Sequence, residues 1–332
     1  MGPGIFSVWD SNMKEKIQKF IRPCGGFSDN FIISALLSLV IVTAGGILSL
    51  SLFGFLDVQE KLTAWLGSDN LGTFLSDYLF TIGVWIAGLL FMAIPKKNRP
   101  MLKALAPNRT GNNLKGIIIG LLLGFGSNGF CVLMSVITGD IKLSYNGIDP
   151  LVLLVFLIAV FIQSSSEELT DRIYLYQKLR RRYRNPLVAI VFSALVFMAM
   201  HMSNPGFTAV AGSQIFLVGI IWALIVYYYD SVWVAFWFHT AWNYTQNIIF
   251  GLPNSGIVSE YSIFKLEAAS ARNGLFYNVN FGVEGSIGSS LVLLVIIIVL
   301  ILINRGRPEK KDYWAALEKK AIEKKEMMAS AQ

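Results

Sequence analysis

Long stretches without Asp, Glu, Lys or Arg constrain this chain more than any other feature of its sequence. Only 15% of its 332 residues are charged and 54% are hydrophobic, which leaves too little polar surface for a soluble globule. Most of the stretches approach the length that crosses a bilayer core as helix, so we expect an all-α, polytopic membrane helix bundle of about eight transmembrane helices. The stretches are Phe31–Leu56, Tyr78–Ile94, Gly116–Thr138, Leu151–Ser166, Leu187–Met202, Thr208–Tyr229, Ser231–Phe250 and Gly285–Ile303.

The distribution of Lys and Arg between the loops predicts the orientation of this bundle. With the N-terminus in the cytoplasm, the opposite side keeps only Lys61, Lys142, Lys265 and Arg272. We therefore expect both termini in the cytoplasm, with a cytoplasmic segment at 1–30, the transmembrane bundle at 31–303 and a basic tail at 304–332. The net charge of +7 then faces anionic lipid headgroups, so we expect the lipid bilayer and no nucleic acid as a partner.

The first apolar stretch and the cysteines give information on the cellular compartment of the protein. The run Phe31–Leu56 is too long for a signal-peptide core and no small-residue cleavage site follows it, so we expect it to be retained. Cys24 and Cys131 are the two cysteines, and we expect no structural disulfide. These features suit a bacterial plasma membrane, although an endomembrane protein would look similar. The tail from Asp312 to Met328 reads as a surface helix that is solvated or bound to headgroups.

Two adjacent glutamates follow the fourth apolar stretch. A charged group inside a membrane is costly, so intramembrane ionisable residues are functional candidates. Glu167 and Glu168 come directly after Leu151–Ser166, and no helix breaker occurs before Asn185 and Pro186. We expect one helix over 151–184; the alternative is a span that ends at Ser166, with two interfacial glutamates.

A helical hairpin would bring one of these glutamates to a histidine. Glu167 and His201 lie at nearly equal distances on either side of the turn at Asn185. Each residue of a helix advances the chain by about 1.5 Å, so on antiparallel helices the two residues come level. The sequence thus predicts a carboxylate and an imidazole that meet inside the bundle.

Both histidines of the chain lie in apolar stretches. A single histidine there is more often a satisfied core residue than a catalyst, but two of two favour a site. His239 and Asn243 are four residues apart and share a helix face. The same spacing pairs Glu168 with Arg172, which would keep that carboxylate ionised and fix its rotamer.

Three motifs in this order resemble those of one protein family. The run Glu167–Arg172 fits EExxxR, Phe197–His201 fits FxxxH and His239–Asn243 fits HxxxN. Together they resemble the CAAX prenyl endopeptidase and bacteriocin-processing (CPBP, Abi) family of intramembrane proteases. The resemblance covers about 151–250, an expected protease-like core, and implies an endopeptidase with a polar cavity in the bundle. Asp171 departs from the family pattern, because the family commonly has an aromatic or apolar residue at this position. We expect an interfacial aspartate that pairs with nearby arginines. The alternative is that like-charge repulsion from Asp171 raises the pKa of Glu167.

Peptide hydrolysis needs a water, a base and donors for the oxyanion. We expect Glu167 to be the base, assisted by His201, and His239 and Asn243 to be the donors. Glu168 with Arg172 would order the site. The expected catalytic set is Glu167, Glu168, Arg172, His201, His239 and Asn243.

The competing mechanism uses a metal. Glu167, His201 and His239 would bind a zinc ion and leave one position open for water. Asn243 is a poor zinc ligand and the chain has no HExxH motif, so metal-independent catalysis is favoured and no cofactor is assigned.

Two other function classes use the same polar residues. A transporter would relay protons or bind its cargo there, but transporters usually show repeated halves and this chain has none. A non-catalytic immunity or regulatory membrane protein would keep the pocket for binding. For the protease, the expected partner is a peptide or membrane-protein substrate, with a prenylated CAAX protein as a family possibility. The loop 251–284 would either cover the bundle or form a disordered connector.

Overall fold

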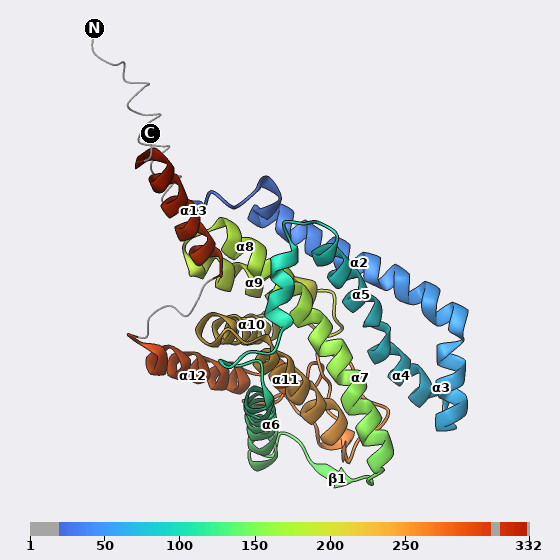
Figure 1. The fold of residues 1–332 in the computed structure, drawn as a ribbon. Helices are drawn as coiled ribbons and strands as arrows, with labels where there is room; N and C mark the ends of the chain where they lie inside the picture. Colours follow the sequence, from blue (N-terminus) through green and yellow to red (C-terminus); the bar gives the residue numbers. More distant parts are fainter. Residues whose placement is uncertain (1–19, 307–312, 331–332) are drawn as a thin grey trace.

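The computed structural model describes residues 20–306 and 313–330, and within them the chain is an all-α bundle, as predicted (Figure 1). Two short antiparallel strands, β1 (Leu143–Tyr145) and β2 (Phe264–Leu266), form a ribbon next to it. The α-helices are α2 (Phe31–Leu56), α3 (Val58–Leu66), α4 (Asp69–Phe80), α5 (Ile82–Ala93), α6 (Leu114–Ile137), α7 (Pro150–Glu168), α8 (Tyr176–Arg182), α9 (Pro186–Met200), α10 (Ala209–Tyr229), α11 (Val232–Asn243), α12 (Ile287–Asn304) and α13 (Tyr313–Ser330). Two π-helical segments, η3 (Leu169–Leu175) and η4 (Tyr244–Ile249), and four short 3-10 helices, η1 (Phe27–Asp29), η2 (Arg99–Leu105), η5 (Ala268–Ser270) and η6 (Val283–Gly285), complete the elements.

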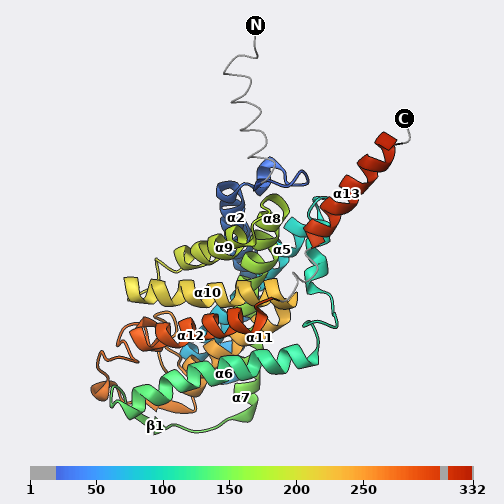
Figure 2. The same ribbon diagram turned by 90° about the vertical axis from the view of Figure 1, so that its left-hand side faces the viewer.

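Six helices of the described part of the chain are long and apolar enough to cross a membrane, and the protein is an integral membrane protein. The six are Phe31–Leu56, Asp69–Ala93, Leu114–Ile137, Pro150–Arg182, Ala209–Tyr229 and Ile287–Asn304. The other two predicted spans form the shorter helices α9 and α11, so for them the expected count of eight stays a prediction. The start of α2 and α13 lie at the same end of the bundle (Figure 2), and their side of the membrane also stays a prediction.

Small residues face inward on α2, and large apolar residues face outward. Ser34, Ser38 and Gly45 are buried, whereas Leu36 and Ile47 are more than half exposed. This pattern is the reverse of that in a soluble protein, because lipid solvates the large side chains and small residues let membrane helices approach closely.

A stripe of glycines fixes the contact between α6 and α11. Gly116, Gly120 and Gly124 recur at every fourth position of α6 and are buried. A Cβ atom on Gly120 would lie 2.7 Å from the carbonyl oxygen of Val234, a backbone atom of α11. The glycines therefore let the two helix backbones touch, as in other small-residue membrane interfaces. This contact holds α11 between α6 and α7, where its other face carries His239.

The predicted hairpin of α7 and α9 is present. The helix that begins at Pro150 continues through η3 and α8 to Arg182, close to the predicted end. The side chain of Asn185 accepts a hydrogen bond from the backbone N–H of Leu187 at 3.0 Å, and Pro186 occupies the first position of α9. An Asn cap followed by Pro is a strong helix start, which explains why the chain reverses here.

A buried ion cluster ties three segments together at the end of the bundle that carries α13. Asp29, just before α2, contacts Nη2 of Arg181 at 2.5 Å and Nζ of Lys178 at 3.0 Å, both on α8. The Arg181 guanidinium also donates to the carbonyl of Lys97 at 2.6 Å and to the side chain of Asn98 at 3.0 Å, in the loop after α5. Burial alone would raise the pKa of Asp29, but the hydrogen bonds and charge of Arg181 outweigh it and hold that pKa below its usual value.

The tail helix α13 is docked rather than free along its first turns. Trp314 is 3% exposed and donates from Nε1 to Oε1 of Gln177 on α8 at 2.8 Å. Glu318 pairs with Arg22 at 3.2 Å and with Arg184 at 2.5 Å. The expectation of a merely solvated or headgroup-bound helix is therefore wrong for its N-terminal half. Several predicted cytoplasmic cations lie outside the described residues: Lys14, Lys16, Lys19, Arg307, Lys310 and Lys311.

We expect Gly120→Ala to destabilise the protein, because the added methyl group meets backbone atoms that cannot move aside. Overpacking of this kind costs about 1–3 kcal/mol, so the unfolding midpoint in detergent should fall by about 2–8 °C. Gly126→Ala is the matched control on the same helix, since nothing lies within 4 Å of its added Cβ. Equal shifts in both variants would contradict the close contact of α6 with α11.

Asp29→Asn should lower the unfolding midpoint at pH 7, because it leaves Arg181 and Lys178 buried without a countercharge, at a cost of about 3–5 kcal/mol. A carboxyl with a lowered pKa stabilises the fold above its unfolded-state pKa of about 3.9, and this contribution is lost as the pH falls through the folded-state value. The difference between wild type and variant should therefore shrink below about pH 4. Thermal unfolding at pH 7 and pH 3, with the exposed Asp69→Asn as control, measures it; a difference independent of pH would refute this account.

Candidate active site

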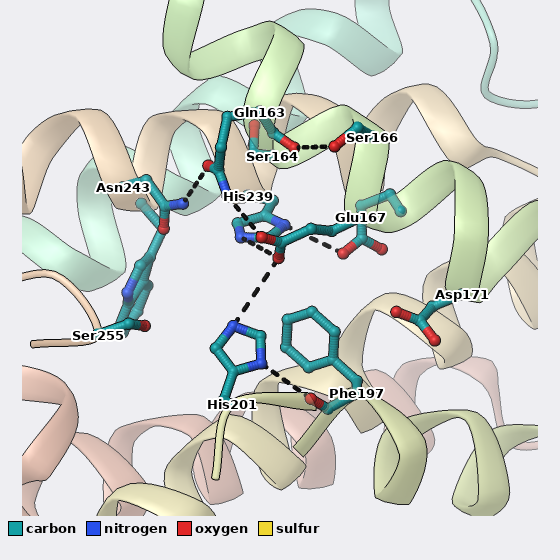
Figure 3. A network of polar contacts seen from close by, with 12 residues as sticks. Gln163, Ser164, Ser166, Glu167, Asp171, Phe197, His201, His239, Asn243 and Ser255 are labelled. Atoms are coloured by element: carbon teal, nitrogen blue, oxygen red, sulfur yellow. Dashed lines mark hydrogen bonds and ion pairs between the residues drawn. The ribbon is translucent and has the colours of Figure 1, made fainter. Parts of the chain in front are cut away.

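A cavity of about 370 Å³ lies within the bundle where α7, α9, α10 and α11 meet. Four of the predicted catalytic residues line it: Glu167, His201, His239 and Asn243. They come from α7, from the end of α9 and from α11, and Figure 3 shows their side chains converging on one space. The predicted meeting of the three motifs is confirmed in the geometry.

Glu167 lies at the centre of this group (Figure 3). Its Oε2 atom is 3.9 Å from Nε2 of His201 and 3.8 Å from Nε2 of His239. Its Oε1 atom accepts a hydrogen bond from Nε2 of Gln163, one turn earlier on α7. Oε2 is buried and has no hydrogen-bond partner among the described residues. One oxygen is therefore held in place and the other faces both imidazoles.

A backbone carbonyl orients His201. This residue is the C-cap of α9, and its Nδ1 lies 2.8 Å from the carbonyl oxygen of Phe197 in the preceding turn. A carbonyl can only accept, so Nδ1 carries a proton and Nε2 of a neutral ring is left as an acceptor toward Glu167. The FxxxH spacing is thus the spacing of one hydrogen-bonded helical turn.

Glu168 orients His239. Its Oε1 atom lies 3.1 Å from Nδ1 of His239, and the imidazole stacks on Trp222 with ring centroids 4.1 Å apart. A carboxylate only accepts, so Nδ1 is protonated and Nε2 faces Glu167. A carboxylate that fixes the tautomer of a histidine is a recurring device of catalytic sites.

The predicted pair of Glu168 and Arg172 is present and fully buried. Oε2 of Glu168 lies 3.1 Å from Nε of Arg172, as an ion pair rather than a well-aligned hydrogen bond. The guanidinium also donates to the carbonyl of Gly219 at 3.2 Å and lies over the rings of Phe197 and Trp222, at 4.9 and 5.3 Å. Arg172 thereby joins η3 to α9 and α10 directly behind the cavity.

Asn243 lies on the same side of α11 as His239, as predicted. Its Nδ2 donates to Oε1 of Gln163 at 3.2 Å, and Gln163 in turn donates to Glu167. An amide nitrogen has two hydrogens, so one remains for a substrate atom. Gln163 was not among the predicted site residues, although its position four residues before Glu167 places it on the same helix face.

The expectation of an interfacial aspartate at position 171 is wrong. Asp171 is 1% exposed and lines the cavity, and its Oδ2 lies 3.8 Å from Nη1 of Arg172. The reason is that the helix does not end near the glutamates; it continues as η3, all seven residues of which are buried. π-Helical turns inside α-helices are frequent at functional sites.

The loop 251–284 covers the cavity, which decides between the two predicted alternatives. Asn254, Ser255 and Glu284 from this loop line the cavity. The Glu284 carboxylate accepts from Nε1 of Trp242 at 2.9 Å and from the backbone N–H of Ser255 at 2.7 Å, and so anchors the loop to α11. Burial raises the pKa of Glu284, although the bonds from Ser255 and Trp242 act against that rise. No local pattern in the sequence singled out this glutamate.

The three residues expected to bind zinc converge, and the distances from Glu167 to the two imidazoles are slightly longer than a tetrahedral ion requires. Ligand bonds of about 2.0–2.2 Å require donor atoms about 3.3–3.6 Å apart. The two distances from Glu167, 3.8 and 3.9 Å, are longer. Among the described residues, no group of three or more His, Cys, Asp or Glu is arranged to hold a metal ion.

Comparison with known proteins identifies the segment that carries this geometry. Residues 149–245 match the family model of Type II CAAX prenyl endopeptidase Rce1-like proteins. This segment is similar to the Rce1-like family of CAAX-type proteases. The resemblance drawn from the three motifs is confirmed, and all three lie within the matched residues. The Rce1-like segment spans under a third of the 332 residues. No curated protein and no solved structure matches the chain.

Proposed function

We propose that this protein is an intramembrane endopeptidase in which Glu167 activates the hydrolytic water. The observation that carries the proposal is the free Oε2 atom of Glu167, buried in the cavity and facing Nε2 of both His201 and His239. A water that hydrogen-bonds to a carboxylate and an imidazole at about 2.8 Å fits atoms 3.8–3.9 Å apart. Glu167 would take a proton from this water as it attacks the scissile carbonyl.

The oxyanion that forms would be stabilised from the α11 side of the cavity. Asn243 offers its second amide hydrogen, since the first is bound to Gln163. His239 donates from Nε2 only as an imidazolium, because Nδ1 already faces Glu168 at 3.1 Å. The Glu168 carboxylate offsets that charge, while Arg172 holds Glu168. His201 remains the group that assists Glu167 with proton transfer.

A carrier or a non-catalytic binding protein would also use a polar cavity in a bundle. The match to a peptidase family favours hydrolysis over both. We propose a peptide or membrane-protein substrate and the lipid bilayer as partners. The concentration of Lys and Arg in the terminal segments and in the same-side loops supports both termini in the cytoplasm, and we propose a bacterial plasma membrane as the location.

Glu167→Gln should abolish cleavage, because an amide cannot accept the proton of the attacking water. Loss of a general base typically lowers turnover by about 100- to 10,000-fold. The assay uses purified protein in neutral detergent with a quenched fluorescent peptide library. The variant should keep the wild-type unfolding midpoint, since Gln has the shape of Glu, and the exposed Glu60→Gln should keep full activity. Wild-type turnover in Glu167→Gln would remove the proposed base.

Metal removal tests the competing mechanism. Because Glu167 faces both imidazoles at distances that fit a bridging water, we expect a strong chelator to leave cleavage of the same library unchanged. Elemental analysis of the purified protein should find no stoichiometric zinc. Loss of activity on chelation, restored by added zinc and not by calcium, would replace the water-activation scheme with a metal-dependent one.

A further inference from the structure

The cavity is acidic beyond what the proposed hydrolysis needs. Besides Glu167, three carboxylates line it: Asp77 on α4, Asp171 on η3 and Glu284 on η6. Among the described residues that line it, none is Lys or Arg. Glu284 is engaged by Trp242 and Ser255 as the anchor of the covering loop. Asp171 has no such task in the mechanism.

Arg172, the nearest cation, does not neutralise all of these carboxyl groups. Arg172 lies behind the cavity wall, 0% exposed, with Glu168 at 3.1 Å and Asp171 at 3.8 Å. One guanidinium therefore stands against three acidic residues of this helix, Glu167, Glu168 and Asp171. The carboxyl groups of the cavity therefore outnumber the cations beside them, in a largely buried site where electrostatic interactions are stronger than in water.

Two buried side chains that line the cavity carry polar atoms without a hydrogen bond. Oδ1 of Asp171 and both amide atoms of Gln214 on α10 have no hydrogen-bond partner among the described residues, and each residue is 1% exposed. Both residues line the cavity, and Figure 3 shows the Asp171 carboxylate pointing toward the space where Glu167 and His201 meet. Buried polar groups in native structures are nearly always satisfied, so these atoms indicate a polar ligand.

The position of Asp171 defines where that ligand would lie relative to the chemistry. It follows Glu167 by four residues, about 6 Å along the helix. An extended peptide advances about 3.3 Å per residue. A group bound at Asp171 therefore belongs to a substrate residue within about two positions of the bond that Glu167 attacks.

We propose that Asp171, with Gln214 as a second polar wall, forms a subsite for a cationic group of the substrate. The group is a Lys or Arg side chain within about two residues of the scissile bond. A carboxylate and an amide oxygen both accept from such a group, and Asp77 at the exposed side of the cavity adds attraction of the same sign. This inference names the substrate class of the proposed peptidase and rests on that function.

The test compares three quenched peptide libraries that differ only in one residue type, supplied as Lys, norleucine or Glu. In neutral detergent, wild-type protein should cleave the Lys library at least about tenfold faster per enzyme than the norleucine library, and the Glu library more slowly still. Mass spectrometry of the products should place Lys within two residues of the cut bond. In Asp171→Asn, the ratio of Lys to norleucine cleavage should fall to about threefold or less. Asp69→Asn, which removes the same charge from an exposed site on α4, should keep the wild-type ratio.

A binding measurement separates this inference from the proposed function. Glu167→Gln protein is heated with millimolar N-acetyl-lysine amide or N-acetyl-norleucine amide, and the unfolding midpoint is recorded. Stabilisation by the lysine probe alone, lost when Asp171→Asn is added, supports the subsite even if no library is cleaved. Cleavage without charge preference, or a preference unchanged in Asp171→Asn, overturns the subsite and leaves the peptidase standing. Equal responses to the two probes together with no cleavage overturn both.

Discussion

A charged side chain buried inside a membrane bundle needs a partner of opposite charge. In this protein, Arg172 is that partner for the buried Glu168. Its guanidinium contacts Glu168 at 3.1 Å, donates to Gly219 and lies over the rings of Phe197 and Trp222. One side chain thus joins the helix that carries the glutamates to the two helices that wall the cavity. Removing it would leave a carboxylate unpaired at low dielectric, which is among the most destabilising changes a protein can suffer.

A series of contacts connects Arg172 to the reacting atoms. Arg172 holds Glu168, Glu168 holds the ring of His239, and that ring presents Nε2 to Glu167. On the other side, the Phe197 carbonyl holds His201 through the last turn of α9. Each of the two histidines is therefore oriented through its Nδ1 atom, which leaves Nε2 toward Glu167. Such support is what keeps a site in the geometry that catalysis needs.

Helix packing brings these parts together. The glycine stripe of α6 lets α11 approach until backbone atoms touch, and the inward serines and glycine of α2 do the same on the other side of the bundle. In lipid, burying apolar side chains does little to drive helices together. Close van der Waals contact and hydrogen bonds between the helices must stabilise their association instead. On α2 the large apolar residues face outward, and the interior of the bundle holds buried polar groups that share partners as well as its apolar core.

The sequence alone determined the helices, the hairpin at Asn185 and the residues of the three motifs. Each of these features depends on residues that lie within one or two helical turns of one another. The meeting of Glu167 with His201 could be predicted for the same reason, since a tight turn leaves antiparallel helices only one register. Only the tertiary structure decided the rest. Asp171 became a cavity residue because helices from elsewhere in the chain bury η3, and Gln214 and Glu284 joined the site across long sequence separations that no local period encodes. Charge compensation and burial are properties of the assembled bundle, so the acidity of the cavity could be recognised only after every wall was in place.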